Sequence, residues 1–327
     1  MTKREDILIV RNDRLGDTIL ALPVIPLIRK HQPNKRIVFW TSRFQAPLLR
    51  YIKGIDLVIT DKEELLTDRT IKTAFCLNPT FDNAFNIYKA GIPERIGTGR
   101  RWYSFLFNRR INLSRRKSSL HEADLNLDLV RNYGFYGGGD FPVIEIPPVI
   151  RDRFFNETSE INEDDFSGNV VVIHPGSGGS ARNWPARYYK QLADEIDFRT
   201  GARVIITGIK QESETCSYVA GEKHLNICNR TNLLELSALL QRIDLLITNS
   251  TGPLHLAVAL GSRTIGLFPP LKDCLPSRWG PYKHPEWALT PELPLCIKCT
   301  PGNFSKCACM EQLSVERVLK SVLELLE

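Results

Sequence analysis

Short apolar runs alternate with segments of helical periodicity along the first half of this chain. Four runs rich in β-branched and aromatic residues stand apart, and the segments between them carry apolar residues every three to four positions. This pattern predicts strands at 6–11, 36–41, 56–60 and 73–78, and helices at 18–30, 43–53, 81–91 and 122–133.

The second half repeats the same rhythm. It predicts strands at 170–175, 202–208, 243–248 and 263–268, and helices at 186–200, 212–222, 232–241 and 253–260. Strands that alternate with helices favour parallel sheets covered by helices on both faces. The predicted fold class is therefore α/β, with two doubly wound, Rossmann-like domains that face a cleft.

Glycine and proline mark the expected junction between the two halves. The stretch 134–154 is rich in both residues, and we interpret it as a connection with at most one edge strand. We expect an N-terminal domain over 1–150, a linker over 151–168, a C-terminal domain over 169–312, and an amphipathic helix in the last segment, 313–327.

Length and composition agree with two globular domains. The chain has 327 residues, of which 43% are hydrophobic and 24% charged. Its apolar runs are shorter than the roughly 18 to 20 residues that cross a bilayer, and its N-terminus carries charges where a signal peptide is apolar. We therefore expect a cytoplasmic protein.

Positive charge is concentrated in residues 94–121. This stretch holds eight arginine and lysine residues against one acidic residue, Glu94, and four aromatic residues lie among them. Aromatic side chains between basic ones favour an anionic partner, which is a phosphorylated glycolipid, a membrane surface or nucleic acid. The alternative is a solvated basic loop.

The stretch 243–266 combines a strand, a polar turn and a helix. The turn contains Asn249, Ser250, Thr251 and Gly252, and the helix after it contains His255. Hydroxyl groups and backbone N–H groups at a helix N-terminus form an anion site, and open α/β sheets bind ligands at such strand tips. His255 suits a packed histidine as well as a ligand contact.

A second polar loop follows the strand at 170–175. Residues 176–180 read Gly-Ser-Gly-Gly-Ser, and Arg182 adds a fixed charge, so the segment suits a diphosphate. Residues 176–181 also match the dinucleotide pattern G-x-G-x-x-A, but strand 202–208 ends in Thr-Gly, without the acidic residue that a nicotinamide ribose needs. The chain has neither a P-loop motif nor a D-x-D metal motif. The negative charge of a diphosphate would therefore have to be stabilised by Arg182, loop N–H groups and helix N-termini.

Two carboxylates are candidates for chemistry. Asp17 follows the first strand and opens a helix, where it serves either as an N-cap or as the general base for an acceptor hydroxyl. Glu212, four residues after Gly208, is a candidate to accept hydrogen bonds from ribose hydroxyls.

Four of the eight cysteines cluster near the C-terminus. Cys296, Cys299, Cys307 and Cys309 have the spacing C-x2-C-x7-C-x-C. Four thiolates can hold zinc or an iron–sulfur cluster, but the closing C-x-C is tighter than the usual C-x2-C knuckle. We favour a thiol-rich loop without a metal, and we expect no cofactor.

Three motifs, in this order, resemble glycosyltransferase family 9, the ADP-heptose:lipopolysaccharide heptosyltransferases. They are RLGD at 14–17, HPGSG and RNWP within 174–185, and TNSTGPLHLAVALG at 248–261. The resemblance covers nearly the whole chain. It implies the GT-B fold, an inverting reaction without a metal ion, and a nucleotide sugar bound mainly by the C-terminal domain.

The resemblance also implies functional residues. Asp17 matches the catalytic base, and Arg182 matches a contact to the diphosphate at a position where relatives often have lysine. The residues that match the donor site are Ser177, Gly178, Glu212, Asn249, Ser250, Thr251, Gly252 and His255. The candidates for contact with an anionic acceptor are Arg14, Arg100, Arg101 and Arg109.

Position 250 departs from the family pattern. Relatives read N-D-[ST]-G-x-x-H, with an aspartate that contacts the heptose, whereas this chain has Ser250. Serine carries no charge and cannot bridge two sugar hydroxyls as a carboxylate does. The departure bears on the donor sugar more than on the fold or the reaction class.

The resulting expectation is an inverting glycosyltransferase. It moves a sugar, first of all heptose from ADP-heptose, onto a lipopolysaccharide core acceptor at the inner face of the inner membrane, with no nucleic acid partner. The alternatives are a transferase of the same fold with another nucleotide sugar, a non-catalytic nucleotide-sugar-binding homologue, and a nicotinamide oxidoreductase.

Overall fold

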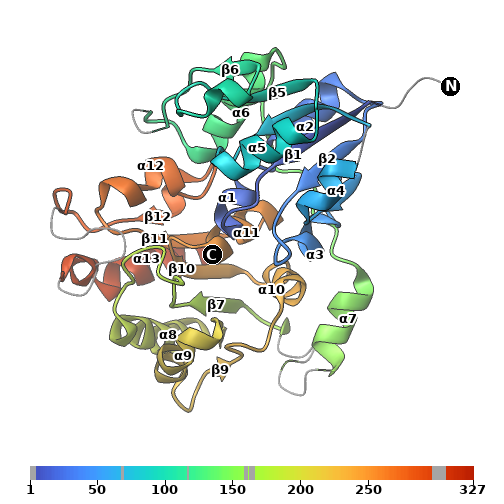
Figure 1. The fold of residues 1–327 in the computed structure, drawn as a ribbon. Coiled ribbons are helices and arrows are strands. Elements are labelled where there is room, and N and C mark those ends of the chain that lie inside the picture. The colour runs from blue at the N-terminus through green and yellow to red at the C-terminus, as the bar shows by residue number, and fades with distance from the viewer. Residues whose placement is uncertain (1–4, 68–69, 116–117, 158–160, 162–165, 297–306) are drawn as a thin grey trace. The chain divides into compact units, whose positions relative to one another are not determined.

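The computed structural model describes residues 5–67, 70–115, 118–157, 161, 166–296 and 307–327. The chain divides into two units, residues 1–145 and 146–327, and each is built around one sheet of six strands (Figure 1). The observed strand pairings within both sheets are parallel.

The first sheet has the strand order β3-β2-β1-β4-β5-β6. Its strands are β1 (Asp6–Val10), β2 (Ile37–Trp40), β3 (Leu57–Ile59), β4 (Ile71–Cys76), β5 (Glu94–Thr98) and β6 (Arg109–Ile111). The helices of this unit are α1 (Leu15–Ile19), α2 (Val24–His31), α3 (Ala46–Leu49), α4 (Lys62–Thr67), α5 (Phe81–Lys89) and α6 (Glu122–Tyr133), with a 3-10 turn η1 (Ser104–Leu106). Every residue of β1 is buried, as in a parallel strand covered on both faces.

The second sheet has the strand order β12-β11-β10-β7-β8-β9. Its strands are β7 (Val170–His174), β8 (Arg203–Ile206), β9 (Leu225–Asn226), β10 (Leu245–Asn249), β11 (Thr264–Leu267) and β12 (Ala288–Leu289). The helices are α7 (Pro148–Glu157), α8 (Ala186–Thr200), α9 (Ser213–Ala220), α10 (Leu233–Leu240), α11 (Gly252–Leu260), α12 (Pro276–Trp279) and α13 (Val315–Leu326). The 3-10 turns are η3 (Lys210–Glu212), η4 (Lys272–Cys274), η5 (Pro285–Trp287) and η6 (Cys309–Gln312).

Both sheets have the same doubly wound order. In each, the first three strands run outward to one edge, and the chain then returns to place the fourth strand on the other side of the first. The strand order therefore reverses between β1 and β4, and again between β7 and β10. Ligands of such sheets bind beyond the carboxyl ends of the strands at this switch point. The prediction of parallel, doubly wound α/β sheets is confirmed.

Three local predictions are corrected by the structure. Residues 94–121 are not only a loop, because they contain β5 and β6. The helix expected over 18–30 is two helices, α1 and α2, and the turn between them ends at Pro23, which has no backbone N–H to donate. The helix expected over 43–53 is reduced to the single turn of α3.

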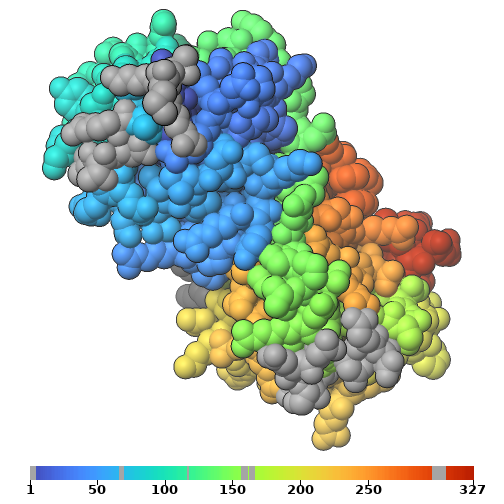
Figure 2. Space-filling model, turned by 90° about the vertical axis from the view of Figure 1, so that its right-hand side faces the viewer, coloured from blue at the N-terminus to red at the C-terminus, as the bar shows by residue number. Residues whose placement is uncertain are grey.

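The segment around the junction contains a helix. α7 starts before the stretch 151–168 that was expected as a linker, and it packs against α10 with Phe154 and Phe155 buried. Figure 2 shows α7 at the surface of the second unit. The predicted C-terminal amphipathic helix is confirmed as α13, which packs against α8 and is capped by the Ser314 hydroxyl. None of the described helices combines the length and apolar composition needed to span a bilayer.

Candidate functional site

Two polar segments meet at the switch point of the second unit. β7 ends at His174 and continues into the loop 175–181, while β10 ends at Asn249 and continues into α11. The two strands are parallel neighbours, so both segments leave the same edge of the sheet. The hydroxyl of Ser180 donates a hydrogen bond to the backbone carbonyl of Ser250 at 3.0 Å, which joins the segments directly.

Asn249 is a fully buried bridge between these segments. Its side-chain Nδ2 donates to the carbonyl oxygens of Pro175 (2.7 Å) and Gly176 (3.2 Å), and its Oδ1 accepts from the backbone N–H of Trp184 (2.9 Å). Both Nδ2 hydrogens and one Oδ1 lone pair are thus used inside the protein. The sequence predicted Asn249 as a contact to the donor. In the structure its side-chain hydrogen bonds hold the loop after β7 and the segment before α8 together.

The loop after β7 is shaped by its own hydrogen bonds. Ser177 is buried, its hydroxyl donates to the carbonyl of Ala181 at 3.1 Å, and its own carbonyl accepts from the N–H of Ser180 at 3.0 Å. Gly178 and Gly179 have φ of +54° and +76°, a backbone conformation that favours glycine. The N–H of Gly178 donates to Glu212. The N–H groups of Gly178 and Ser180, which were expected to be free for an anion, are therefore occupied.

The carboxylate of Glu212 ties this loop to the turn after β8. Oε1 accepts from the N–H of Gly178 at 2.8 Å, and Oε2 accepts from the N–H of Ile209 at 3.0 Å. A β-carbon at Gly176 would lie 1.9 Å from this carboxylate, so only glycine leaves room for it. Each carboxylate oxygen keeps a second lone pair that can accept a further hydrogen bond.

His174 lies beside Glu212, and sequence reasoning assigned it no role. Its Nδ1 lies 3.1 Å from the Thr207 hydroxyl, and its Nε2 lies 3.7 Å from Oε2 of Glu212. Burial lowers the pKa of the imidazole from its ordinary value of 6.5, and the neighbouring carboxylate opposes this shift. His174 is therefore neutral at pH 7. The available signal was its place at the end of an otherwise apolar strand, directly before the glycine-rich loop.

The remaining expected donor residues lie at the start of α11. Thr251 is the N-cap residue, is buried, and has its hydroxyl 3.2 Å from that of Thr248. Gly252 is the first residue of the helix, and His255 follows one turn later in a buried position. The structure thus brings the turn residues together with the loop after β7.

Arg182 points toward the C-terminal segment of the chain. Its Nη2 donates to the backbone carbonyl of Cys307 at 3.0 Å. Together with Trp184, Arg187 and Tyr218, it lines a pocket of about 820 Å³. Its Nε is buried and has no hydrogen-bond partner among the described residues. A buried donor without a partner is uncommon, and it suits contact with a ligand or a water molecule.

Arg11 is the centre of a polar cluster at the switch point of the first unit. It follows β1 directly and is 3% exposed. Its Nη2 donates to Oδ1 of Asp17 at 2.5 Å, its Nε to Oδ1 of Asp13 at 2.8 Å, and its Nη1 to the carbonyl of Leu77, just after β4, at 2.9 Å. Sequence reasoning missed Arg11. The available signal was a charged residue directly after an apolar strand, where burial of the charge requires partners.

Asp17 is held as an ion pair and does not cap its helix. It lies in the first turn of α1, whose N-cap residue is Arg14, and no side chain caps this helix. The N-cap interpretation of Asp17 is therefore wrong. Its side chain keeps 20% of its surface exposed, so the carboxylate that Arg11 orients remains accessible.

Further charged groups surround Arg11. The buried carboxylate of Glu122 forms an ion pair with Arg115 and lies 3.5 Å from Nη1 of Arg11. Asn126 Oδ1 accepts from Nη2 of Arg115 at 2.9 Å. Burial raises the pKa of Asp13, while Arg11 opposes that shift. The cluster thus links the ends of β1 and β4 to α6.

The four arginines expected at the acceptor do not lie together. Arg14 follows β1, and Arg100 and Arg101 follow β5, so these three exposed side chains leave the carboxyl edge of the sheet. Arg109 lies in β6, and its Nε donates to Oε1 of Glu94 at 3.3 Å. Glu94 is the first residue of β5, so Arg109 points toward the opposite edge.

Exposed aromatic rings stack beside Arg100 and Arg101. Phe81 stacks on Phe85 with ring centroids 5.7 Å apart, and on Trp102 with centroids 5.1 Å apart. We call these three residues, from α5 and the segment after β5, the aromatic patch. Trp102 is 74% exposed. Exposed, contiguous aromatic surface of this kind marks an interaction site.

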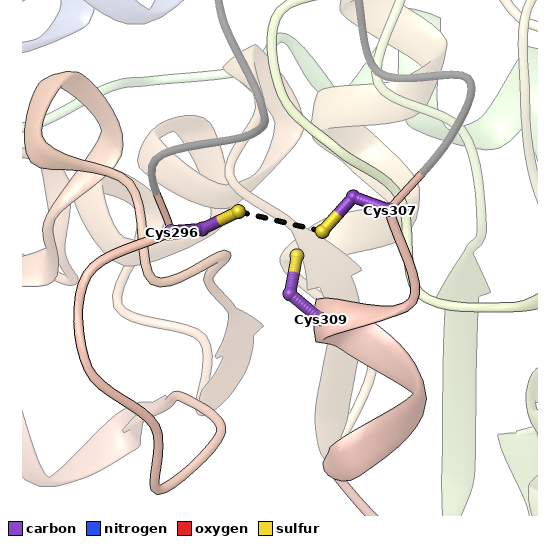
Figure 3. A group of neighbouring side chains, drawn as sticks. All are labelled: Cys296, Cys307 and Cys309. Atoms are coloured by element: carbon purple, nitrogen blue, oxygen red, sulfur yellow. Dashed lines mark hydrogen bonds between the residues drawn. The ribbon is translucent and has the colours of Figure 1, made fainter.

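Three of the clustered cysteines converge. The sulfur atoms of Cys296, Cys307 and Cys309 all lie within 4.8 Å of one another (Figure 3). The fourth candidate, Cys299, lies outside the described residues.

Comparisons with known proteins agree with one family. The sequence model of glycosyltransferase family 9 (heptosyltransferase) matches residues 68–296. A protein of Haemophilus influenzae named as a glycosyltransferase is 28% identical, over 97% of this chain and 96% of its own length. Lipooligosaccharide heptosyltransferase 2 of Campylobacter jejuni is 24% identical, over 95% of this chain and 96% of its own.

The fold also matches a solved structure. ADP-heptose LPS heptosyltransferase II of Escherichia coli superposes with a TM-score of 0.82 at 19% identity, and the match covers 98% of each chain. This likeness, with the two Rossmann-ordered sheets, shows the GT-B fold. The family model matches well over half of the residues of this chain. The chain therefore belongs to glycosyltransferase family 9 and is a glycosyltransferase.

Proposed function

We propose that this glycosyltransferase moves a heptose from ADP-heptose onto a lipopolysaccharide core, with inversion at the anomeric carbon. The names of its relatives support the substrates, since one is a lipooligosaccharide heptosyltransferase and another an ADP-heptose LPS heptosyltransferase. The ion pair of Arg11 with Asp17 is the observation that carries the proposed chemistry.

Asp17 acts as the general base in this proposal. Its carboxylate takes the proton from an acceptor hydroxyl, the hydroxyl oxygen bonds to the anomeric carbon, and the bond from that carbon to the diphosphate breaks, so that ADP leaves with the electron pair. Arg11 is a positioning residue that fixes the orientation of the carboxylate. A positioned base of this kind accelerates proton transfer by about 10²- to 10⁴-fold.

The second unit binds the donor in this proposal. Arg182 and the N-terminal turn of α11, with Thr251, Gly252 and His255, meet the charge that develops on the diphosphate. Glu212 accepts hydrogen bonds from the ribose through its remaining lone pairs. Ser177 and Gly178 shape the loop beside the diphosphate, and Asn249 holds that loop in place as a positioning residue. The donor requires no divalent ion here, because the cationic groups come from the protein.

Ser250 favours a second candidate, a transferase of the same fold that uses another nucleotide sugar. Its hydroxyl can make single hydrogen bonds to a sugar but brings no negative charge. A thermal-shift panel of nucleotide sugars separates the candidates, because a ligand that binds only the folded state raises its melting temperature. The largest shift with ADP-heptose supports the first candidate, and a larger shift with a different nucleotide sugar supports the second.

The acceptor side of the proposal involves the first unit. Arg14, Arg100 and Arg101 contact the anionic glycolipid, and the aromatic patch touches the inner membrane surface, so that the enzyme is a peripheral protein on the cytoplasmic side. Arg109, which points toward the other edge of the sheet, is left out of this set. Polybasic and aromatic side chains together suit an anionic membrane interface.

The experiment is a transfer assay with ADP-heptose and lipopolysaccharide core acceptor. We expect acceptor-dependent release of ADP, a product whose mass increases by one heptose, and an inverted anomeric configuration by NMR. A brief exposure to EDTA should leave the rate unchanged. Donor binding without any release of ADP would instead identify a non-catalytic homologue.

A further inference from the structure

We propose that Cys296, Cys307 and Cys309 bind a thiophilic metal ion, zinc or ferrous iron, in a structural site. The proposal goes beyond the transfer reaction and does not depend on it. It departs from the sequence-based preference for a thiol-rich loop without a metal, because the structure brings together thiols that the sequence separates by up to thirteen positions.

The sulfur geometry carries the proposal. Cys296 and Cys307 have their Sγ atoms 3.3 Å apart, and all three Sγ atoms lie within 4.8 Å of one another (Figure 3). A tetrahedral ion with metal–sulfur bonds of about 2.3 Å holds its sulfurs about 3.8 Å apart. Shifts of about 1 Å or less therefore bring the three sulfurs into coordination distance. One position of the tetrahedron remains for a fourth donor.

The backbone holds the three thiols in this convergent arrangement. The N–H of Cys296 donates to the carbonyl of Pro270 at 2.6 Å, and Cys309 is buried at the start of η6. The carbonyl of Cys307 accepts from Arg182. The backbone around each of the three cysteines is therefore held in place by contacts that do not involve the thiol groups. Soft thiolate ligands select zinc, copper(I) and iron over magnesium or calcium.

A disulfide between Cys296 and Cys307 is the competing outcome. The observed separation of 3.3 Å is well beyond a sulfur–sulfur bond of about 2.05 Å. A disulfide would also leave Cys309 without a role, whereas a metal ion uses all three thiols and compensates the negative charge of the thiolates.

The site would fasten the C-terminal segment to the chain that follows β12, where Cys296 lies. The segment after Cys309 is also held at the start of α8 by two bonds: Nε1 of Trp184 donates to the carbonyl of Leu313 at 2.8 Å, and Arg187 pairs with Glu311 at 2.7 Å. A metal that joins Cys296 to Cys307 and Cys309 would give the C-terminal segment a second point of attachment. Its role is structural, as in other thiolate sites in which a fourth donor completes the tetrahedron.

Metal content tests the proposal on the full chain. Protein produced with zinc and iron in the medium, and purified under reducing conditions, should contain about one equivalent of metal by elemental mass spectrometry. Cys307→Ser and Cys309→Ser should each lose most of it and melt at lower temperature. Cys228→Ser is the matched control, because Cys228 is half-buried like Cys296 and Cys307 but lies outside the cluster, and it should keep the metal.

A second measurement covers variants that fail to fold. Wild-type protein stripped of metal and titrated with Co²⁺ should develop the intense near-ultraviolet charge-transfer absorption of cobalt–thiolate bonds and regain its melting temperature. Protein without bound zinc or iron that gives no such absorption would overturn the proposal. So would a Cys296–Cys307 disulfide found by mass spectrometry in protein kept reduced until alkylation.

Discussion

The guanidinium of Arg11 binds the carboxylate of Asp17, with Nη2 donating to Oδ1 at 2.5 Å. The two residues come from different segments, since Arg11 directly follows β1 and Asp17 lies in the first turn of α1. Arg11 is itself fixed by Asp13 and by the carbonyl of Leu77. The carboxylate of Asp17 is therefore bound to a guanidinium group, that of Arg11, which has little freedom to move.

Asp17→Asn should remove the general base while preserving the shape of the site. We expect kcat to fall by about 10²- to 10⁴-fold. The nucleotide sugar should still raise the melting temperature as it does for the wild type, because the donor is proposed to bind the other unit. Undiminished turnover in this variant would rule out the assigned role.

Arg11→Lys should act through Asp17. Lysine keeps the charge but cannot reproduce the several directed bonds of a guanidinium. We expect kcat to fall with little change in the KM for the donor, and Arg11→Ala to destabilise the fold by about 3–5 kcal/mol, because Asp13 and Glu122 lose a buried partner. Denaturant unfolding and steady-state kinetics measure the two effects.

A surface ion pair of the same unit supplies the control. Arg29 pairs with Asp56 at 2.6 Å, and both side chains are more exposed than Arg11. Because Arg29 also donates to the backbone carbonyls of Lys35 and Gly54, Arg29→Ala should destabilise the fold, but by less than Arg11→Ala, and should leave kcat unchanged. Equal effects at Arg11 and Arg29 would contradict a special role for the buried arginine.

Asn249→Ala should loosen the loop after β7. The change leaves the Trp184 N–H and the carbonyls of Pro175 and Gly176 without their buried partner, which costs about 1–3 kcal/mol for a group left unsatisfied. We expect weaker donor binding by calorimetry together with a lower free energy of unfolding. Asn183→Ala, at an exposed asparagine nearby, should leave that free energy nearly unchanged. Unaltered donor affinity in Asn249→Ala would argue against its positioning role.

His174 should make the fold sensitive to acid. Its pKa is below the ordinary 6.5 in the folded protein because of burial, so below pH 6.5 the unfolded chain binds a proton that the folded chain does not. The free energy of unfolding should therefore fall as pH drops from 6.5 toward the folded-state pKa, by at most about 1.4 kcal/mol per pH unit from this group.

His174→Asn isolates this contribution, since the amide replaces Nδ1 but does not titrate. Urea unfolding between about pH 7.5 and about pH 5.5 should give a shallower dependence on pH for the variant than for the wild type. The readout is the slope and not the stability at one pH, because the substitution also changes packing. Parallel slopes would show that another group controls the acid response.

The aromatic patch should bind anionic membranes. Trp102→Ala removes the most exposed ring of the stack and should reduce co-sedimentation with vesicles that contain anionic lipid severalfold. Phe198→Ala is the matched control, because Phe198 is 83% exposed on α8 of the other unit. Neutral vesicles should bind neither protein well. Equal loss in both variants would show that general exposed apolar surface, and not the patch, is responsible.

The central strands and most helices could be predicted because burial imposes a clear pattern on them. β1 and β7 are buried throughout and mostly apolar, since parallel strands are covered on both faces. β5 and β6 were missed because they lie toward one edge of their sheet and carry charged residues, among them Glu94 and Arg109. An edge strand with charged side chains has no pattern that separates it from a loop.

The candidate site could be predicted only as far as its local motifs. Asp17 lies in the short polar segment and helix start after the first strand, and the turn at 249–252 lies between a strand and a helix, so both can be recognised from the sequence alone. The partners of Arg11 come from the segments after β1 and β4, from α1 and from α6. The segments joined by Asn249 are up to 74 positions apart. These hydrogen bonds and ion pairs depend on tertiary packing, which a local sequence pattern does not predict.

The hydrogen bonds of Asn249 also bear on how readily the loop after β7 opens. They attach the loop to the end of β10, a central strand of the sheet next to β7, and not to the two-residue edge strands β9 and β12. Fraying at either edge leaves these bonds intact. The amide hydrogen of Trp184, which donates to Asn249, should therefore exchange with solvent only at the slow rate of the central strands, and the loop that we propose to hold the nucleotide should stay preformed between turnovers.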